Sequence, residues 1–229
     1  MANTLGSPTM GFQSFGRQEG GSPTDGLTPC WIASTDPGPI FRGDPIVTVS
    51  SNPGANLSGN YITSVNTNAI TESSGFLCRG VFQGCYQFQP SAGRVVWSNF
   101  YNGTVTGSTG DIKAYIIDDP QTNFLVQGST RGAITSSMVG FNVGITYNTT
   151  TGNTATGYSN VTVESTSTGG AALRPFRIVD FYSAYAPPGV PAVGTAAFIN
   201  GTDNTTPANM VIVRLNNCDR LNLTAKSSA

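Results

Sequence analysis

GDIKAYIIDDPQTNFLVQG, residues 110–128, is the most regularly patterned stretch of this 229-residue chain. Apolar side chains alternate over residues 112–117 and again over residues 122–127, which is the two-residue period of a β-strand. Residues 118–121 have turn chemistry, because Pro120 presets φ for the second turn position and aspartate side chains cap nearby N–H groups. We therefore predict that residues 110–128 form one β-hairpin with an architectural role.

The composition of the whole chain indicates the same class of structure. Charged residues make up only 10% of the chain and apolar residues 38%, while glycine, serine, threonine and asparagine are abundant. Such a chain has few helix formers and many β-branched and turn-forming residues. We predict an all-β protein with a compact sandwich or barrel body of about ten short antiparallel strands, since turn signals recur every ~8 to 14 residues. The expected strands span residues 46–49, 61–65, 76–88, 95–97, 112–117, 122–127, 141–147, 161–163, 173–182 and 210–215.

Several local signals refine this prediction. Gly80 and Gly84 interrupt the strand expected at residues 76–88, which indicates a bulge or a sharp bend of the kind that barrels need. Residues 134–140 are the best helix candidate, with one turn at most before a glycine stop. Residues 148–160, NTTTGNTATGYSN, are expected to form a polar loop.

The N-terminal segment differs from the rest of the chain. Residues 1–29 are rich in glycine, proline, serine and threonine, so we expect an extended N-terminal arm, followed by a β-rich body at residues 30–229. The length of the body also admits two subdomains with a boundary near residues 90–110. Isolated apolar side chains on such an arm are typical of a segment that orders on a partner, and a disordered leader with incidental aromatic residues is the alternative. The candidate partner-binding residues are Met10, Phe12, Phe15 and Arg17.

Charge and hydropathy indicate that the partner is neither a nucleic acid nor a membrane. The net charge is −1 and the 11 lysines and arginines are scattered singly, so no basic stripe is available for nucleic acid. No run of 18 apolar residues predicts a membrane span, and no signal peptide is expected, which indicates synthesis in a cytoplasm. A weakly charged surface suits a protein that is covered by partners or by copies of itself.

The sequence contains no recognisable catalytic motif, so we expect a structural or binding protein and no cofactor. The chain has no histidine, which removes the commonest general base. Asp118 and Asp119 are adjacent in a turn, where capping of the backbone is favoured over a glycosidase pair. An isolated aspartate in the asparagine-rich stretch 201–204 leaves calcium as an alternative. Buried free thiols are favoured over a zinc site for the four cysteines, Cys30, Cys78, Cys85 and Cys218.

Four stretches, taken in order, resemble the head decoration (cement) proteins of tailed bacteriophages. They are residues 2–23 with Gly11-Phe12 and Phe15-Gly16-Arg17, residues 41–47 with the sequence FRGDPIV, residues 77–86 followed by 114–127, and residues 175–179 followed by 211–217. Together they span most of the chain, and the polar stretches 148–160 and 200–209 match less well.

The resemblance implies a virion structural protein on the outer face of an icosahedral head, made in the host cytoplasm. Its partners would be the major capsid protein and copies of itself, with a homotrimer at local threefold axes as the expected state. Proteins of this kind hold neighbouring capsid subunits together against internal DNA pressure. In that setting, residues 1–29 would reach across a neighbour, with Phe12 and Phe15 as apolar anchors and Arg17 as a polar contact.

Two other functions are compatible with the same composition. One is a different virion part, such as a tail, baseplate or fibre module, although no shaft repeat is visible. The other is a carbohydrate-binding β-sandwich, in which aromatic side chains stack on sugars. The candidates for that role are Trp31, Trp97, Tyr101 and Tyr115.

Overall fold

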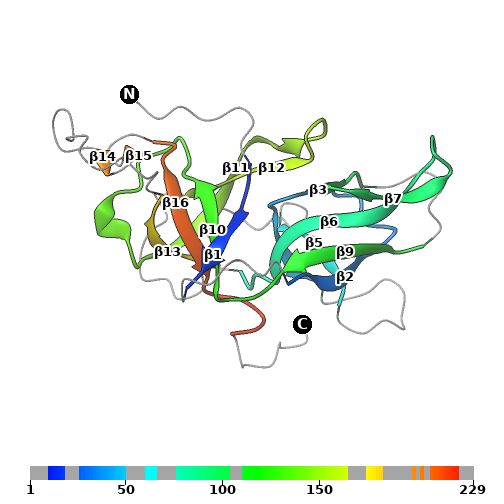
Figure 1. The fold of residues 1–229 in the computed structure, drawn as a ribbon, viewed down its shortest axis with the longest axis horizontal. Helices are drawn as coiled ribbons and strands as arrows, with labels where there is room; N and C mark the ends of the chain where they lie inside the picture. The colour runs from blue at the N-terminus through cyan, green and yellow to red at the C-terminus, as the bar shows by residue number, and fades with distance from the viewer. Residues whose placement is uncertain are drawn as a thin grey trace.

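The computed structural model describes residues 10–18, 26–49, 60–65, 76–103, 110–164, 174–182, 198–199, 202–203 and 207–221. These residues form mainly antiparallel β-structure together with the 3₁₀ turn η2 (Ser136–Met138), which confirms the all-β prediction. Two curled six-stranded sheets, here called sheet I and sheet II, lie side by side (Figure 1). Two short pairs complete the described structure: β3 (Ile40–Phe41) with β8 (Phe100–Tyr101), and β14 (Phe198–Ile199) with β15 (Thr202–Asp203).

Sheet I has the strand order β1-β10-β16-β13-β11-β12. Its strands are β1 (Gln13–Arg17), β10 (Thr122–Gln127), β16 (Met210–Leu215), β13 (Phe176–Phe181), β11 (Asn142–Asn153) and β12 (Tyr158–Glu164). The sheet curls round, because Gly128 at the end of β10 forms a bridge with Val163 in β12. The N–H of Ser129 donates to the Val163 carbonyl at 2.8 Å and holds the two ends together.

Sheet II has the strand order β2-β9-β6-β4-β5, and β7 pairs with β6. Its strands are β2 (Thr28–Ile32), β9 (Ile112–Ile117), β6 (Gly80–Gln89), β4 (Pro45–Thr48), β5 (Ile62–Ser64) and β7 (Arg94–Ser98). It also curls, since Tyr61 forms a bridge with Trp31, and the Trp31 N–H donates to the Asn60 carbonyl at 3.0 Å.

The two sheets share their hydrophobic interior. Strands β4, β6 and β9 each place one side chain inside sheet II and its sequence neighbour in the core of sheet I. These pairs are Ile46 and Val47, Phe82 and Val81, and Ile116 and Ile117, with the sheet II residue given first. Both faces of these strands are therefore buried at the ends that meet sheet I, and neither sheet covers its apolar surface without the other.

Residues 110–128 do not form the predicted hairpin. Strand β9 lies between β2 and β6 in sheet II, whereas β10 lies between β1 and β16 in sheet I. The alternation of apolar residues was therefore a correct signal for two strands, but it carries no information about which strand lies alongside each. Residues 118–121 cross from one sheet to the other instead of reversing the chain within one sheet.

Asp118 holds this crossing in place. Its side chain is buried, and its Oδ1 accepts a hydrogen bond from the Thr28 hydroxyl at 2.7 Å. Its Oδ2 lies 3.0 Å from Arg220 Nε and 3.5 Å from an Arg79 guanidinium nitrogen. Asp119 caps the turn as predicted, because its Oδ1 accepts the Gln121 N–H at 3.0 Å. The first aspartate thus contacts residues that are distant in the sequence, whereas the second caps the local backbone.

The predicted polar loop at residues 148–160 is wrong. Strand β11 continues to Asn153 and β12 begins at Tyr158, with Gly152 opposite Ser159 across the pair. The segment is polar on both faces, so it lacks the apolar alternation that would have indicated strands. Its threonines nevertheless favour extended backbone.

Two smaller predictions are confirmed. The register of β6 against β9 shifts between Phe82 and Gly84, which is the expected bulge. Gly84 has φ +151°, and a Cβ there would lie 2.4 Å from a ring atom of Trp97. The helical turn η2 has Thr135 at its N-cap, and Gly140 follows it at φ +89°.

Residues 10–18, expected within the arm, belong to sheet I in this structure. Strand β1 pairs antiparallel with β10, and the Phe12 side chain is fully buried. The expected subdomain boundary at residues 90–110 falls within sheet II, between β6 and β9, and the chain changes sheet at residues 118–121. Residues 1–9 and 19–25 of the expected arm lie outside the described residues.

Candidate binding surfaces

The four candidate partner-binding residues occupy different environments. Phe12 stacks on Phe176, with ring centroids 4.2 Å apart, in the core of sheet I. Met10 and Phe15 are at the surface, and the ring of Phe15 packs edge-on against Tyr182. Arg17 forms an ion pair with Asp119 at 3.1 Å. A contact with a partner thus remains a prediction for all four, and the three surface residues are placed to make one without unfolding β1.

A second surface was only partly visible in the sequence. Tyr86, Trp97 and Tyr115 form one cluster on the outer face of sheet II, with ring centroids 5.3 to 5.9 Å apart. Cross-strand register produces it, because Tyr86 in β6 lies opposite both Trp97 in β7 and Lys113 in β9. Lys113 lies 5.6 Å from the ring centroid of Tyr115, within cation–π range. We call these three aromatic residues, with Trp31, the aromatic face.

Trp31 belongs to the same outer face. It pairs directly with Lys113 across β2 and β9, and side chains of such a pair point to the same side of a sheet. Trp31, Tyr86 and Trp97 are 41%, 45% and 43% exposed, although aromatic rings of this size usually bury most of their area. Tyr101, the fourth residue considered for sugar binding, is fully buried and donates its hydroxyl to the Asp36 carbonyl at 2.8 Å.

Gly84 makes the aromatic face possible. Any side chain at this position would meet the Trp97 indole and the Ser98 carbonyl oxygen at 2.4 and 2.7 Å. Its φ of +151° is also one that residues with a Cβ rarely adopt. The bulge glycine therefore lets the indole lie directly against strand β6.

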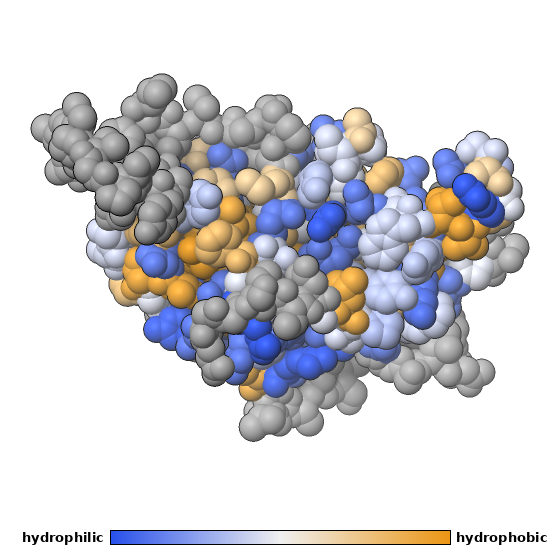
Figure 2. Space-filling view, in the orientation of Figure 1, coloured by the Kyte–Doolittle hydropathy of each residue, from blue (hydrophilic) through white to orange (hydrophobic). Residues whose placement is uncertain are grey.

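Exposed apolar side chains are not confined to the aromatic face. Figure 2 shows orange groups over sheet I and at the edge where Figure 1 places the β6–β7 hairpin. Among the residues that the structure describes, Val95 in β7 is the most exposed large apolar side chain at 61%, and Phe141 beside η2 is 48% exposed. Apolar side chains that are exposed singly are normal on protein surfaces, so only a gathered group such as the aromatic face indicates a contact area.

A buried carboxylate lies where the two sheets meet, and sequence reasoning missed it. Asp44 is fully buried between the turn after β3 and strand β12. Its Oδ2 accepts the Phe41 N–H at 2.7 Å, and its Oδ1 accepts a hydrogen bond from the Ser159 hydroxyl. Burial raises the pKa of Asp44 to about 7, against the opposing effect of these hydrogen bonds. Nothing in the sequence distinguishes this aspartate from one in an ordinary Gly-Asp-Pro turn.

The cysteines match their prediction. All four are buried and free, and burial raises the pKa of each thiol, to about 12 for Cys85. Within the described ranges, no group of three His, Cys, Asp or Glu side chains converges as metal ligands would. The same residues contain no helix with the length and hydropathy needed to span a membrane.

No known protein family, curated protein or solved structure matched this chain in three separate comparisons. Function is therefore inferred from the surfaces described above.

Proposed function

We propose that this chain is a structural protein of a phage virion, which decorates the outer face of an icosahedral head and holds neighbouring major capsid subunits together, as a homotrimer. The order of the motifs that resemble cement proteins supports this proposal, as does the low charge of the chain. The observation that carries it is the aromatic face, where three half-exposed aromatic side chains and Tyr115 gather on one side of sheet II.

Tyrosine and tryptophan are the residues that most often dominate the affinity of protein interfaces. Aromatic side chains clustered on a rigid sheet lose little conformational freedom on binding. Little of the free energy gained by burying them is therefore offset by a loss of conformational entropy. Weak binding by each copy is sufficient on a shell, because many copies and several subunits act together. Met10, Phe15 and Arg17 supply a second contact area beside β1, on the other sheet.

The test is co-sedimentation of the purified protein with expanded, undecorated heads, together with its oligomeric mass. We expect a trimer that saturates the heads, and a loss of about tenfold or more in affinity for Trp97→Ala. Phe141→Ala, at an equally exposed site beside η2, is the matched control and is expected to bind normally. Phe15→Ala tests the second contact area.

Surface substitutions are preferable to deletion of residues 2–20. That deletion also removes Phe12 from the core, so a loss of binding would not distinguish a missing contact from a damaged fold. A folded protein that fails to bind heads would exclude the proposed function, and its position on tails, baseplates or fibres in cryo-EM would favour those virion parts instead.

The aromatic face also supports one function of a different class. Trp31, Trp97 and Tyr115 lie on one face, as a carbohydrate-binding β-sandwich requires. Quenching or enhancement of tryptophan fluorescence by neutral oligosaccharides, lost in Trp97→Ala, would favour sugar binding over head binding.

A further inference from the structure

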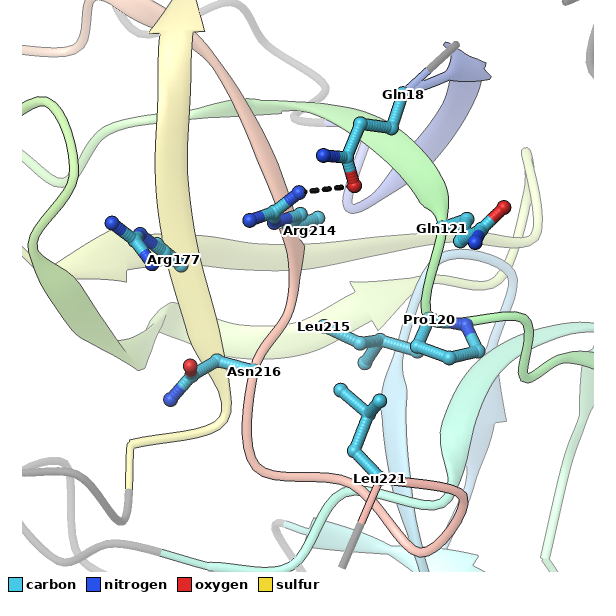
Figure 3. A pocket seen from close by; sticks show the side chains of 8 residues that line it. All are labelled: Gln18, Pro120, Gln121, Arg177, Arg214, Leu215, Asn216 and Leu221. Atoms are coloured by element: carbon cyan, nitrogen blue, oxygen red, sulfur yellow. Dashed lines mark hydrogen bonds between the residues drawn. The ribbon is translucent and has the colours of Figure 1, made fainter.

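A surface pocket of about 290 Å³ lies beside the crossing between the two sheets (Figure 3). One side of it is formed by Gln18 after β1, Arg177 in β13 and Arg214 in β16, and the lining also includes the amides of Gln121 and Asn216. Apolar groups on the other side include Pro120 and Leu221. The pocket thus combines cationic and amide groups with an apolar wall.

The two arginines are direct neighbours. Arg177 and Arg214 are register partners in the antiparallel pair of β13 and β16, which places their Cα atoms roughly 4.5–5.5 Å apart. Both face outward, because the adjacent Ile178 and Val213 are in the core. Like charges directly opposite each other destabilise a sheet, so this arrangement favours an anion between or beside them.

The described residues do not supply that anion. Four other arginines each lie within 3.6 Å of a carboxylate oxygen: Arg17, Arg79, Arg131 and Arg220. Neither Arg177 nor Arg214 has a carboxylate at ion-pair distance among the residues that the structure describes. The nearby carboxylates have other partners, since Asp119 pairs with Arg17 and Asp180 accepts the Phe181 N–H.

Gln18 strengthens the donor character of the pocket. Its Oε1 accepts a hydrogen bond from an Arg214 guanidinium nitrogen (Figure 3). With that oxygen occupied, the amide offers N–H donors to a ligand, as the guanidinium groups do. Arginine recognises carboxylate and phosphate oxygens with paired, charge-assisted hydrogen bonds.

The apolar wall distinguishes between these two oxyanions. Leu221 is half-exposed beside Pro120, where a ligand carbon chain would cover both. Inorganic phosphate has no apolar part with which to use that wall. We propose that this pocket binds a carboxylate attached to a short apolar group, through Arg177 and Arg214. The proposal is separate from head binding, because the pocket lining includes no residue of the aromatic face and none of Met10, Phe15 and Arg17.

The test is an NMR titration of the full chain that follows the guanidinium Nε–Hε signals of Arg177 and Arg214. Sodium butyrate is expected to shift both signals in a saturable manner, and inorganic phosphate to bind at least about tenfold more weakly. Arg177→Gln and Arg214→Gln are each expected to weaken butyrate binding about tenfold or more. Arg94→Gln, at an exposed arginine of β7, is the control that leaves binding unchanged.

Two further probes identify the source of the carboxylate. A short peptide that ends in leucine is titrated with a free terminal carboxylate and as its amide. Tighter binding of the free acid than of butyrate assigns the pocket to a protein chain terminus, and equal or weaker binding assigns it to small free carboxylates.

The amide is expected not to bind. Binding of the amide, equal binding of phosphate, or butyrate shifts that survive both glutamine substitutions would overturn the proposal. So would the absence of saturable shifts in folded wild-type protein, with folding checked by its dispersed spectrum.

Discussion

Replacing the buried Asp44 by asparagine is expected to change how stability depends on pH. The pKa of Asp44 is raised from 3.8 to about 7 because burial disfavours the carboxylate. A raised pKa means that the folded state binds the proton more tightly than the unfolded chain does. The stabilisation by the neutral carboxyl is therefore complete below about pH 3.8 and is lost as the pH rises through about 7.

The size of the effect follows from the same values. Each unit of difference in pKa corresponds to about 1.4 kcal/mol, so the rise from 3.8 to about 7 amounts to about 4 kcal/mol of unfolding free energy. Asparagine stays neutral at every pH. Its oxygen can accept the Phe41 N–H as Asp44 Oδ2 does. Its amide nitrogen takes the place of Oδ1 and can donate to the Ser159 hydroxyl oxygen, which reverses the direction of the hydrogen bond that Ser159 donates to Asp44.

The assay is urea unfolding of the wild type and Asp44→Asn between pH 4 and pH 8. The two proteins are expected to be similar near pH 4, and the variant is expected to be more stable by up to about 4 kcal/mol at pH 8. Other carboxylates contribute equally to both proteins, so the difference isolates residue 44. Asp180→Asn, at an exposed carboxylate, is the control. Parallel stability curves for wild type and Asp44→Asn would refute the reasoning, since they would mean that the folded protein keeps Asp44 ionised.

Three other predictions concern packing. Phe12→Ala is expected to lower the unfolding free energy by about 3–5 kcal/mol in urea titrations, because it empties a ring-sized site between Phe176 and the rest of the core; a loss below about 1 kcal/mol would contradict the burial of this segment. Gly84→Ala is expected to displace the Trp97 indole, and near-ultraviolet circular dichroism identical to wild type would contradict that contact. None of the four buried thiols is expected to react rapidly with a disulfide reagent at pH 8, whereas all four should react in denaturant, and fast labelling of the native protein would contradict their burial.

The strands could be predicted because their side chains alternate, but their neighbours could not. Residues 112–117 and 122–127 read as a hairpin, yet the turn between them crosses from sheet II to sheet I. The alternation of apolar and polar residues shows that one side of a strand is buried. It does not show which sheet the strand belongs to or which strands lie next to it. The burial of Phe12 could not be predicted for a similar reason. An aromatic residue in a glycine-containing segment has the same local sequence whether it contacts a partner or packs in the protein's own core.

The binding surfaces were less accessible from sequence than the strands. Tyr86, Trp97 and Tyr115 are far apart in the chain, and only the pairing of β6 with β7 and β9 brings them together. Arg177 and Arg214 become neighbours in the same way, through β13 and β16. Cross-strand register is a property of the folded sheet, so it has no local signature in the chain.

The order of strands in sheet I also bears on how the chain folds during synthesis. The strands of sheet II lie within residues 28–117 and can pair as soon as that part of the chain has emerged. Sheet I cannot, because β16, the last strand along the described chain, lies between β10 and β13 (Figure 1). Strand β1 cannot pair until β10, more than 100 residues later in the chain, has been synthesised. The pairing of β10 with β16 requires the chain to extend to residue 215. Contacts between such distant segments form slowly, so the nascent protein would expose the apolar faces of β10 and β13 until β16 has been synthesised.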